Sequence, residues 1–402
     1  MDNLSLSRSR RRRSPVRKRV VVALVLFVVI LLGIGLFKVG KYLVAVLQVP
    51  LSQEVNLKET PEKRVNLLIL GVGGGNHDGP NLADTIIFTS IDPKQKQVSL
   101  VSLPRDLWVP QISAKVNQAY VAGEDKTAGT GLKTAKALIG NILGQQIDYV
   151  LKIDFQGFEK AVDTMGGLSV DVARTFDDYA YPVAGQEANP CGNTDDQIAS
   201  LSAEIASGSA TELDAFPCRY EHLHFTKGKT TMDGKTALKY VRSRHAVGPE
   251  GSDFARSQRQ AKVISAFKEK LFSAGTVLNP AKIISLVNIL QGSIEMDIKD
   301  DEYDDFVRLA NKMKDAKISS ITIDEGDGEE DRLGILINPP PDPANGNQWI
   351  LAPRIGVGEY GELQEYVSCK INGSNCLVGE NGITTPTPKP TAMPSGTKIK
   401  SN

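Results

Sequence analysis

The sequence has no excess of charge and little histidine. Its 402 residues include 47 Lys and Arg against 47 Asp and Glu, so the formal net charge is +0, and there are four His. A protein that attracts nucleic acid through its overall field needs an excess of positive charge. The pair His222 and His224 has no identifiable third ligand, so we expect no metal site there. The composition therefore disfavours a nucleic-acid partner and a zinc protein.

Two common classes of nucleotide-binding site are also excluded. The glycine-rich segment 71–76 lacks the sixth-position glycine of a dinucleotide-binding loop and leads toward another strand instead of a helix. No Gly-Lys-Ser/Thr follows it, which rules out a phosphate-binding loop of the Walker type. No cysteine or Ser–His pair is placed to form a covalent intermediate.

Cysteine is scarce, with four residues in the chain, none at zinc-finger spacing. An even, sparse set in an oxidising compartment suits two disulfides, and three pairings are possible. We predict the two pairings that close local loops, Cys191 with Cys218 and Cys369 with Cys376.

A long uncharged run is present near the start of the chain. Residues 1–19 form a strongly basic tail, and residues 20–37 contain no charged side chain. Those 18 residues approach the ~20 that a helix needs to cross a bilayer core. Because basic flanks stay in the cytoplasm, we expect an uncleaved signal-anchor with the rest of the chain outside the cell membrane. A cleaved signal peptide is the alternative interpretation.

The remaining sequence predicts one main domain with a sheet and flanking helices. Continuous or alternating apolar runs predict strands at 65–72, 84–91, 97–103, 149–154 and 168–172. Helical periodicity occurs at 132–143, 155–165, 233–242, 253–272 and 279–291. This order predicts an α/β sandwich in which helices flank a mixed central sheet.

Composition divides the chain further. Polar and irregular residues at 173–227 predict an insertion over a site, pinned by a disulfide. The expected segments are a stalk at 38–63, the main domain at 64–298, a C-terminal α+β extension at 299–378 and a disordered Pro/Thr-rich tail at 379–402.

Outside the basic tail, a cluster of four arginines lies at 237–260. Arg242 and Arg244 close one apolar helical pattern, and Arg256, Arg259 and Gln260 share one face of the next helix. That face continues into apolar residues, which indicates that its polar end is sheltered. Arginine forks match phosphate oxygens in pairs, so the cluster predicts a site for a multiply charged phosphate. A solvated helix face is the alternative.

Carboxylates and one more arginine are expected near this cluster. Asp78 and Asp84 flank the start of the second strand, while Arg105 and Asp106 follow the third. Ligands usually bind at strand ends of α/β sheets, and Mg²⁺ (or Mn²⁺) takes one or two carboxylates together with phosphate oxygens. The combination predicts phosphoryl-transfer chemistry.

The order and spacing of several motifs resemble the LytR–CpsA–Psr family from about residue 64 to residue 272. The matching strings are NLLILGV at 66–72, ADTI at 83–86, SLPRDLWV at 102–109, KVNQAY at 115–120, VDTMGG at 162–167, DGK at 233–235, RSR at 242–244 and DFARSQRQ at 253–260. The resemblance implies a membrane-anchored extracytoplasmic enzyme that transfers a glycopolymer from a polyprenyl-diphosphate carrier to peptidoglycan. It also implies an α/β sandwich with a hydrophobic tunnel for the polyprenyl chain.

The resemblance assigns roles by position. A diphosphate clamp would be formed by Arg105, Arg242, Arg244, Arg256 and Arg259, with a hydrogen bond from Gln260. Asp84 would hold Mg²⁺ and Asp106 would orient the first arginine. The family often has an aspartate ligand two residues after the glycine that corresponds to Gly71, but Gly73 stands there in this chain, and Asp78 is the candidate replacement.

The predicted reaction is attack by a peptidoglycan hydroxyl on the phosphorus next to the sugar, with polyprenyl phosphate as the leaving group. Arg105, Asp106 and Asp84 are the predicted catalytic residues. Two alternatives use the same sequence features: a polyprenyl-diphosphate hydrolase, and a non-catalytic wall-binding or regulatory protein.

Overall fold

The computed structural model describes residues 55–75, 79–271, 273, 293–313, 315–327, 332–373, 376–380 and 382–384. The expected basic tail, the apolar run at 20–37 and the helix at 279–291 lie outside these residues, as does the expected metal ligand Asp78. Within the described residues, no helix combines the length and apolar character needed to cross a bilayer.

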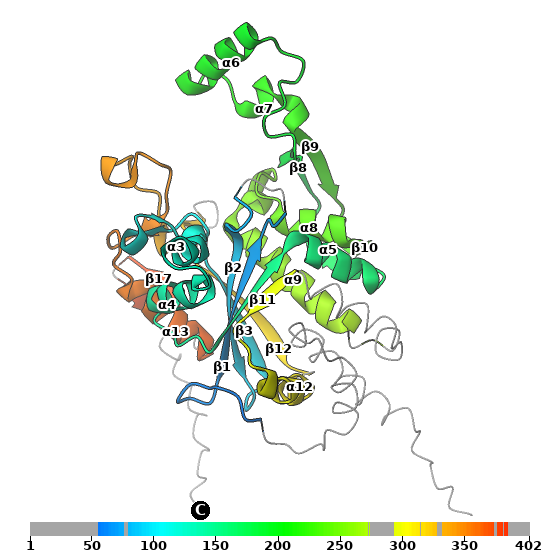
Figure 1. The fold of residues 1–402 in the computed structure, drawn as a ribbon, viewed down its shortest axis with the longest axis vertical. Helices are drawn as coiled ribbons and strands as arrows, with labels where there is room; N and C mark the ends of the chain where they lie inside the picture. The colour runs from blue at the N-terminus through cyan, green and yellow to red at the C-terminus, as the bar shows by residue number, and fades with distance from the viewer. Residues whose placement is uncertain are drawn as a thin grey trace, which may run out of the picture.

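A mixed sheet of six strands forms the centre of the molecule (Figure 1). Its order is β11 (Ile294–Met296), β6 (Tyr149–Asp154), β1 (Val65–Val72), β2 (Ala83–Asp92), β3 (Gln97–Ser102) and β12 (Lys317–Thr322). The pairs β1–β2 and β2–β3 are antiparallel, whereas β1–β6 and β3–β12 are parallel. The predicted mixed central sheet is therefore confirmed.

Helices cover both faces of this sheet, as a sandwich requires (Figure 1). Strand side chains alternate between faces, so Leu68 and Leu70 enter one core while Val65 and Leu67 contact the other. The first core also contains residues of α3 (Ala119–Lys126), α4 (Gly131–Leu143) and α13 (Gly361–Ile371). The second contains residues of α5 (Phe155–Thr164), α8 (Gly234–Arg242), α9 (Asp253–Leu271) and α12 (Tyr303–Lys312).

The strand register brings three chain segments to one end of the sheet. Val72, the last residue of β1, pairs with Ala83, the first residue of β2. Ser102, at the end of β3, pairs with Ile87 four residues further along β2. The turn after β3 and the start of β2 therefore lie close together, at the end where the parallel strands β1 and β6 have their carboxyl termini.

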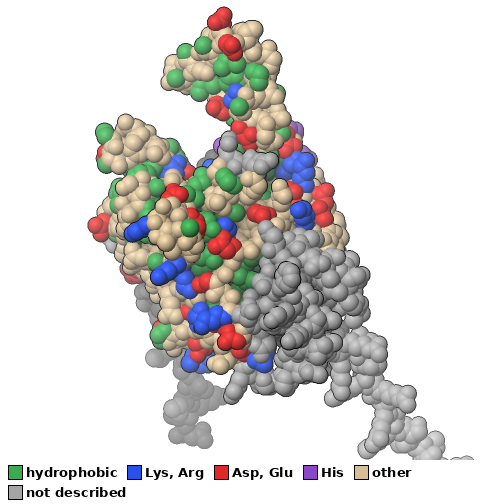
Figure 2. Space-filling model, viewed as in Figure 1, with side chains coloured by type: hydrophobic (Ala, Val, Ile, Leu, Met, Phe, Trp, Pro, Cys, Tyr) green, Lys and Arg blue, Asp and Glu red, His purple; other side chains and the backbone are tan. Residues whose placement is uncertain are grey.

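The insertion at 173–227 is an ordered arm, which corrects the expected irregular loop. An antiparallel ladder of β8 (Phe176–Pro182) and β9 (Tyr220–Phe225) carries α6 (Asp195–Ser207) and α7 (Glu212–Ala215) away from the body (Figures 1 and 2). The sequence contains one indication of α6, because Thr194 and Gln197 have the spacing of a capping box at a helix start.

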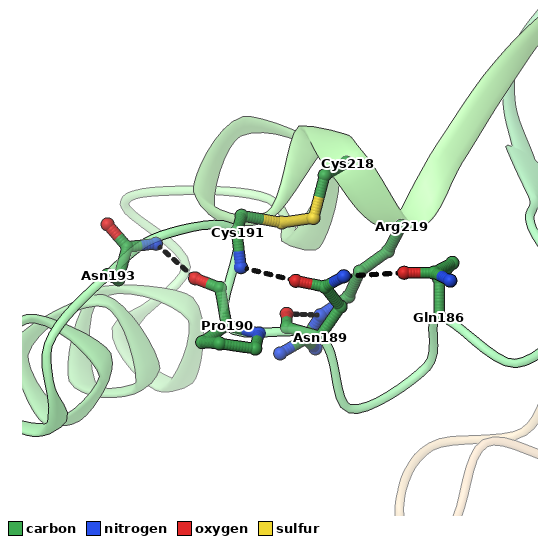
Figure 3. The surroundings of a disulfide bond; sticks show 7 residues. All are labelled: Gln186, Asn189, Pro190, Cys191, Asn193, Cys218 and Arg219. Atoms are coloured by element: carbon green, nitrogen blue, oxygen red, sulfur yellow. Dashed lines mark hydrogen bonds between the residues drawn. A yellow bond between two sulfur atoms is a disulfide. The ribbon is translucent and has the colours of Figure 1, made fainter.

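Both disulfides expected from the sequence are present in the structure. Cys191 and Cys218 join the arm across 27 positions with a Cα–Cα distance of 5.5 Å. Asn189 supports this link, since its side-chain oxygen accepts from the Cys191 amide at 2.8 Å and its carbonyl accepts from Arg219 Nε at 2.9 Å (Figure 3). Cys369, in α13, is bonded to Cys376.

The segment 299–378 shares the sheet and core of the preceding residues. Strand β12 forms one edge of the central sheet, and Leu351 bridges to Leu107 in the turn after β3. The boundary expected at residue 298 therefore does not separate two structural units. The sequence indicated an α+β segment here but not that it would share the central sheet.

Removing the arm disulfide should loosen the arm without unfolding the body. Closing a loop of 27 residues stabilises it by about 3 kcal/mol in the chain-entropy description. In the double variant Cys191→Ser/Cys218→Ser, we expect faster proteolytic cleavage within residues 183–219 and a nearly unchanged unfolding midpoint of the body. The matched control is Cys369→Ser/Cys376→Ser, which leaves the arm intact. Equal cleavage of the arm in all three proteins would contradict this role.

Candidate functional site

A pocket of about 130 Å³ opens at the end of the sheet where β1 and β6 finish. Its lining includes six of the residues selected from the sequence: Asp84, Arg105, Arg242, Arg244, Arg256 and Gln260. They come from β2, the turn after β3, the end of α8 with the residues just beyond it, and α9. Residues up to 176 positions apart in the chain thus meet at one site.

Helix α8 is fixed at its start by a close approach to α5. Asp233 caps the helix by accepting from the Thr236 amide at 2.7 Å, and the Gly234 amide donates to Asp163 at 2.7 Å. A Cβ on Gly234 would lie 2.2 Å from the Glu159 carbonyl oxygen, so only glycine fits there. This contact sets where the last residue of α8, Arg242, reaches the pocket.

Asp84 lies between two arginines. Its Oδ1 accepts from Arg105 Nη1, and its Oδ2 lies 3.5 Å from Arg242 Nη2. The Arg242 guanidinium also lies 4.4 Å from the ring centroid of Phe155, which supports it through a cation–π contact. Asp84 thus fixes the spacing of two cations.

Asp106 fixes a second group of cations and is buried, with its side chain 9% exposed. Lys115 Nζ donates to its Oδ1 at 3.0 Å, Arg244 Nη2 donates to its Oδ2 at 3.1 Å, and Arg105 Nε lies 3.5 Å from Oδ2. Burial alone would raise the pKa of Asp106. The Lys115 bond and the charges of Arg105 and Arg244 outweigh it, so this pKa lies below its ordinary value.

Arg105 therefore joins the two carboxylates. Burial alone would lower its pKa, but Asp84 and Asp106 together raise that pKa above the ordinary value. A permanently charged, oriented guanidinium is what binding of an anion requires. The expectation that Asp106 orients the first arginine agrees with this geometry.

Arg259 corrects the predicted clamp, because it does not reach the pocket. Only 2% of its side chain is exposed. Its guanidinium donates to the carbonyls of Tyr240 at 3.0 Å, Ser243 at 2.7 Å and Glu250 at 2.8 Å, and to Glu250 Oε2 at 3.1 Å. Arg259 thus holds the end of α8 and the loop before α9 in place, instead of binding a ligand. Helical spacing put it on the face of Arg256 without showing which way that face points.

One residue that sequence reasoning missed fixes the turn between Arg242 and Arg244. Asp178, from β8 of the arm, is fully buried and accepts from Ser243 Oγ at 2.6 Å and from the His245 amide at 3.2 Å. Ser243 stands between Arg242 and Arg244, so the base of the arm sets the direction of both. Nothing in the local sequence of the insertion distinguished Asp178 from its other aspartates.

The pocket contains more positive than negative charge. Four arginines line it and Lys115 adds a fifth cation behind Asp106, against three carboxylates, Asp84, Asp106 and Asp178. The difference of two charges (five minus three) among these side chains favours a multiply charged anion. A diphosphate fits this requirement.

Sequence comparison gives the family. The sequence model of the LytR_cpsA_psr family matches residues 45–337, which is most of the chain. The chain belongs to the LytR_cpsA_psr family. The resemblance stated from the motifs is therefore confirmed.

Several characterised members of the LytR_cpsA_psr family are similar to the chain over most of its length. The teichoic acid transferase TagU of Bacillus licheniformis, named for polyisoprenyl-teichoic acid and peptidoglycan, is 24% identical and covers 75% of this chain and 86% of its own. The corresponding TagV of Bacillus subtilis is 23% identical, covering 77% and 71%. A crystal structure of Bacillus subtilis TagV has a TM-score of 0.46 at 22% identity, covering 77% of this chain and 99% of that one.

The described residues do not form a ready metal cage of the kind expected from the resemblance. Within them, no group of three His, Cys, Asp or Glu side chains is arranged to hold a metal ion. Both oxygens of Asp84 face arginines, and Gly73 supplies no carboxylate. The histidine pair on β9 instead shares one partner, since His222 and His224 each contact Asp177 Oδ1 at 2.8 Å.

Replacing Arg259 and replacing Arg256, both in α9, should change the free energy of unfolding by different amounts. Arg259→Ala leaves a buried Glu250 and three carbonyls without their donor, so we expect the free energy of unfolding to fall by about 3–5 kcal/mol. Arg256→Ala, at the pocket and half-buried, should change it by less than about 1 kcal/mol. Urea denaturation measures both, and equal losses would contradict the division into supporting and binding residues.

Stability should depend on acid pH through Asp106. Its folded pKa is lowered, so its contribution to stability is fully present above the ordinary carboxyl pKa of 3.8 and is lost as pH falls through the folded value. We expect the wild-type advantage in unfolding free energy over Asp106→Asn to be constant above about pH 5 and to decrease below about pH 4. Denaturation curves at each pH measure it. An advantage independent of pH across that range would show that the carboxylate charge contributes nothing.

Proposed function

We propose that the protein is a membrane-anchored extracytoplasmic phosphotransferase. It would move a glycopolymer from a polyprenyl-diphosphate carrier to a hydroxyl of peptidoglycan. The observation that carries this proposal is the pocket with four arginines and Gln260, whose excess of positive charge suits a diphosphate. Relatives named as teichoic acid transferases acting with polyisoprenyl-linked teichoic acid and peptidoglycan support the substrate classes.

The reaction follows from charge development. The acceptor hydroxyl oxygen forms a bond to the phosphorus that carries the glycan, and the bond from this phosphorus to the bridging oxygen breaks. Polyprenyl phosphate leaves with that oxygen, and the hydroxyl proton passes to solvent or to an aspartate. Arg105, Arg242, Arg244 and Arg256 stabilise the charge that builds on the bridging and leaving oxygens.

The aspartates act mainly on the arginines in this proposal. Asp84 and Asp106 hold Arg105 from two sides, so its guanidinium needs little reorganisation when the diphosphate binds. Gln260 is 8% exposed and its Oε1 accepts from Ser102 Oγ at 3.2 Å, which leaves its amide donors for a phosphate oxygen. Preorganised donors of this kind are the largest contribution to many transfer reactions.

Mg²⁺, or Mn²⁺, belongs to this proposal as a companion of the substrate. Asp84 would be its protein ligand, with phosphate oxygens and water completing the coordination. Because both oxygens of Asp84 contact arginines in the structure, no step of the reaction is derived through the ion.

Anchoring and lipid binding are parts of the proposal that rest on the sequence. The basic tail followed by residues 20–37 supports a single membrane pass with the pocket outside the cell. A hydrophobic tunnel for the polyprenyl chain would continue from the pocket, as the resemblance implies.

The test is reconstitution with a lipid-diphosphate oligosaccharide and a peptidoglycan oligomer, with and without Mg²⁺. We expect glycan-modified peptidoglycan from the wild type and at least about a hundredfold less from Arg105→Ala and Arg256→Ala, since each removes a preorganised charge. The control is Arg174→Ala, an exposed arginine outside the pocket.

Product analysis separates the competing functions. If free glycan phosphate forms equally with and without acceptor, the protein is a hydrolase and not a transferase. If both pocket variants transfer as well as the wild type, the diphosphate assignment is wrong.

A further inference from the structure

A tryptophan near the pocket has half of its side chain exposed. The chain contains two tryptophans. Trp108 is 6% exposed, whereas Trp349 is 52% exposed and is followed by the buried residues Ile350 and Leu351. Trp349 also lies beyond the part of the chain that the family's sequence model matches, which ends at residue 337. Tryptophan is enriched at binding interfaces, because its large apolar ring carries a polar N–H at one edge.

The loop that carries Trp349 is held at both ends. Its flanks, β15 (Leu336–Ile337) and β16 (Ala352–Pro353), pair as antiparallel strands. Asn338 Nδ2 donates to the Ile350 carbonyl at 2.7 Å, directly beside Trp349. The loop, drawn in orange, and the arm rise as two projections at the same end of the molecule (Figures 1 and 2).

Backbone bonds attach this loop to the pocket. The Leu351 amide donates to the Asp106 carbonyl at 3.0 Å, and the Trp108 amide donates to the Leu351 carbonyl at 2.8 Å. Lys115 Nζ lies 5.9 Å from the ring centroid of Trp349 and also donates to Asp106 Oδ1. The indole is therefore separated from Arg244 by two polar side chains, Lys115 and Asp106, without lining the pocket itself.

We propose that Trp349 stacks against a sugar ring of the acceptor glycan, with Lys115 donating to a hydroxyl or amide oxygen of the same ring. The face of an indole carries partial negative charge and packs well against the C–H groups of a pyranose. Lys115 has three N–H groups, of which one serves Asp106. A sugar ring has an apolar face, which would pack on the indole, and polar groups at its edge, which would accept from Lys115.

The position of Trp349 favours the acceptor over the donor. The first donor sugar is bonded to the diphosphate and must lie in the arginine pocket. Trp349 lies outside the lining of that pocket, so we assign a ring bound there to the second substrate, the acceptor. This assignment rests on the proposed transfer function, but binding of the glycan to Trp349 can be measured without it.

Fluorescence gives the first test, because Trp349 is the exposed one of the two tryptophans. A soluble peptidoglycan oligosaccharide is titrated into the full chain and into Trp349→Phe. We expect a saturable blue shift in the wild type, reduced acrylamide quenching, and neither change in Trp349→Phe, in which Trp108 remains. Identical spectra of the wild type with and without oligosaccharide would overturn the proposal, whether or not the protein proves to be a transferase.

Kinetics give the second test. We expect Trp349→Ala to raise the acceptor KM at least about fivefold, with the donor KM and kcat changed less than about twofold, and Trp349→Tyr to retain most of the affinity. The control is Ile355→Ser, a residue of similar exposure, 54%, which should leave all constants unchanged. A raised donor KM with an unchanged acceptor KM would assign the indole to the donor and overturn the proposal.

Discussion

Repulsion among the arginines is the constraint on which the site depends. Two like charges 4 Å apart repel by about 4 kcal/mol at the effective dielectric near a protein surface. The fold offsets this with carboxylates placed between the cations, Asp84 between Arg105 and Arg242, and Asp106 among Arg105, Arg244 and Lys115. The carboxylates neutralise only part of the positive charge of this cluster. They hold the arginines in place and leave positive charge available for an anion.

A second set of contacts fixes where those arginines point. Arg259 is buried beneath the pocket and ties the end of α8 to the loop around Glu250. From the other side, Asp178 of the arm binds Ser243, the residue between Arg242 and Arg244. The arm is therefore joined to the site by its base, while its helices α6 and α7 lie farther out (Figure 1). The loop of Trp349 rises at the same end of the molecule as the arm (Figure 1).

Sequence reasoning worked where one residue pattern has one physical solution. The run Val65–Val72 is apolar on both faces, which suits a central strand, and the strings around Arg105 and Arg242 are specific enough to mark pocket residues. It was wrong about Arg259, because a shared helix face does not reveal whether a given turn points into the core. The insertion was expected as an irregular loop because its helix α6 buries no residue, and the place of β12 in the sheet was missed because its partner β3 is over 200 positions away.

Binding of a water-soluble prenyl diphosphate, measured by titration calorimetry, tests the central claim without requiring turnover. The account predicts that Arg244→Gln binds it at least about tenfold more weakly than the wild type, since each charged hydrogen bond contributes more than 1 kcal/mol. It predicts wild-type affinity for Lys262→Gln, whose amine bonds to the Asp171 carbonyl on the surface. Equal affinity in the wild type and in Arg244→Gln would show that the pocket arginines do not bind the diphosphate.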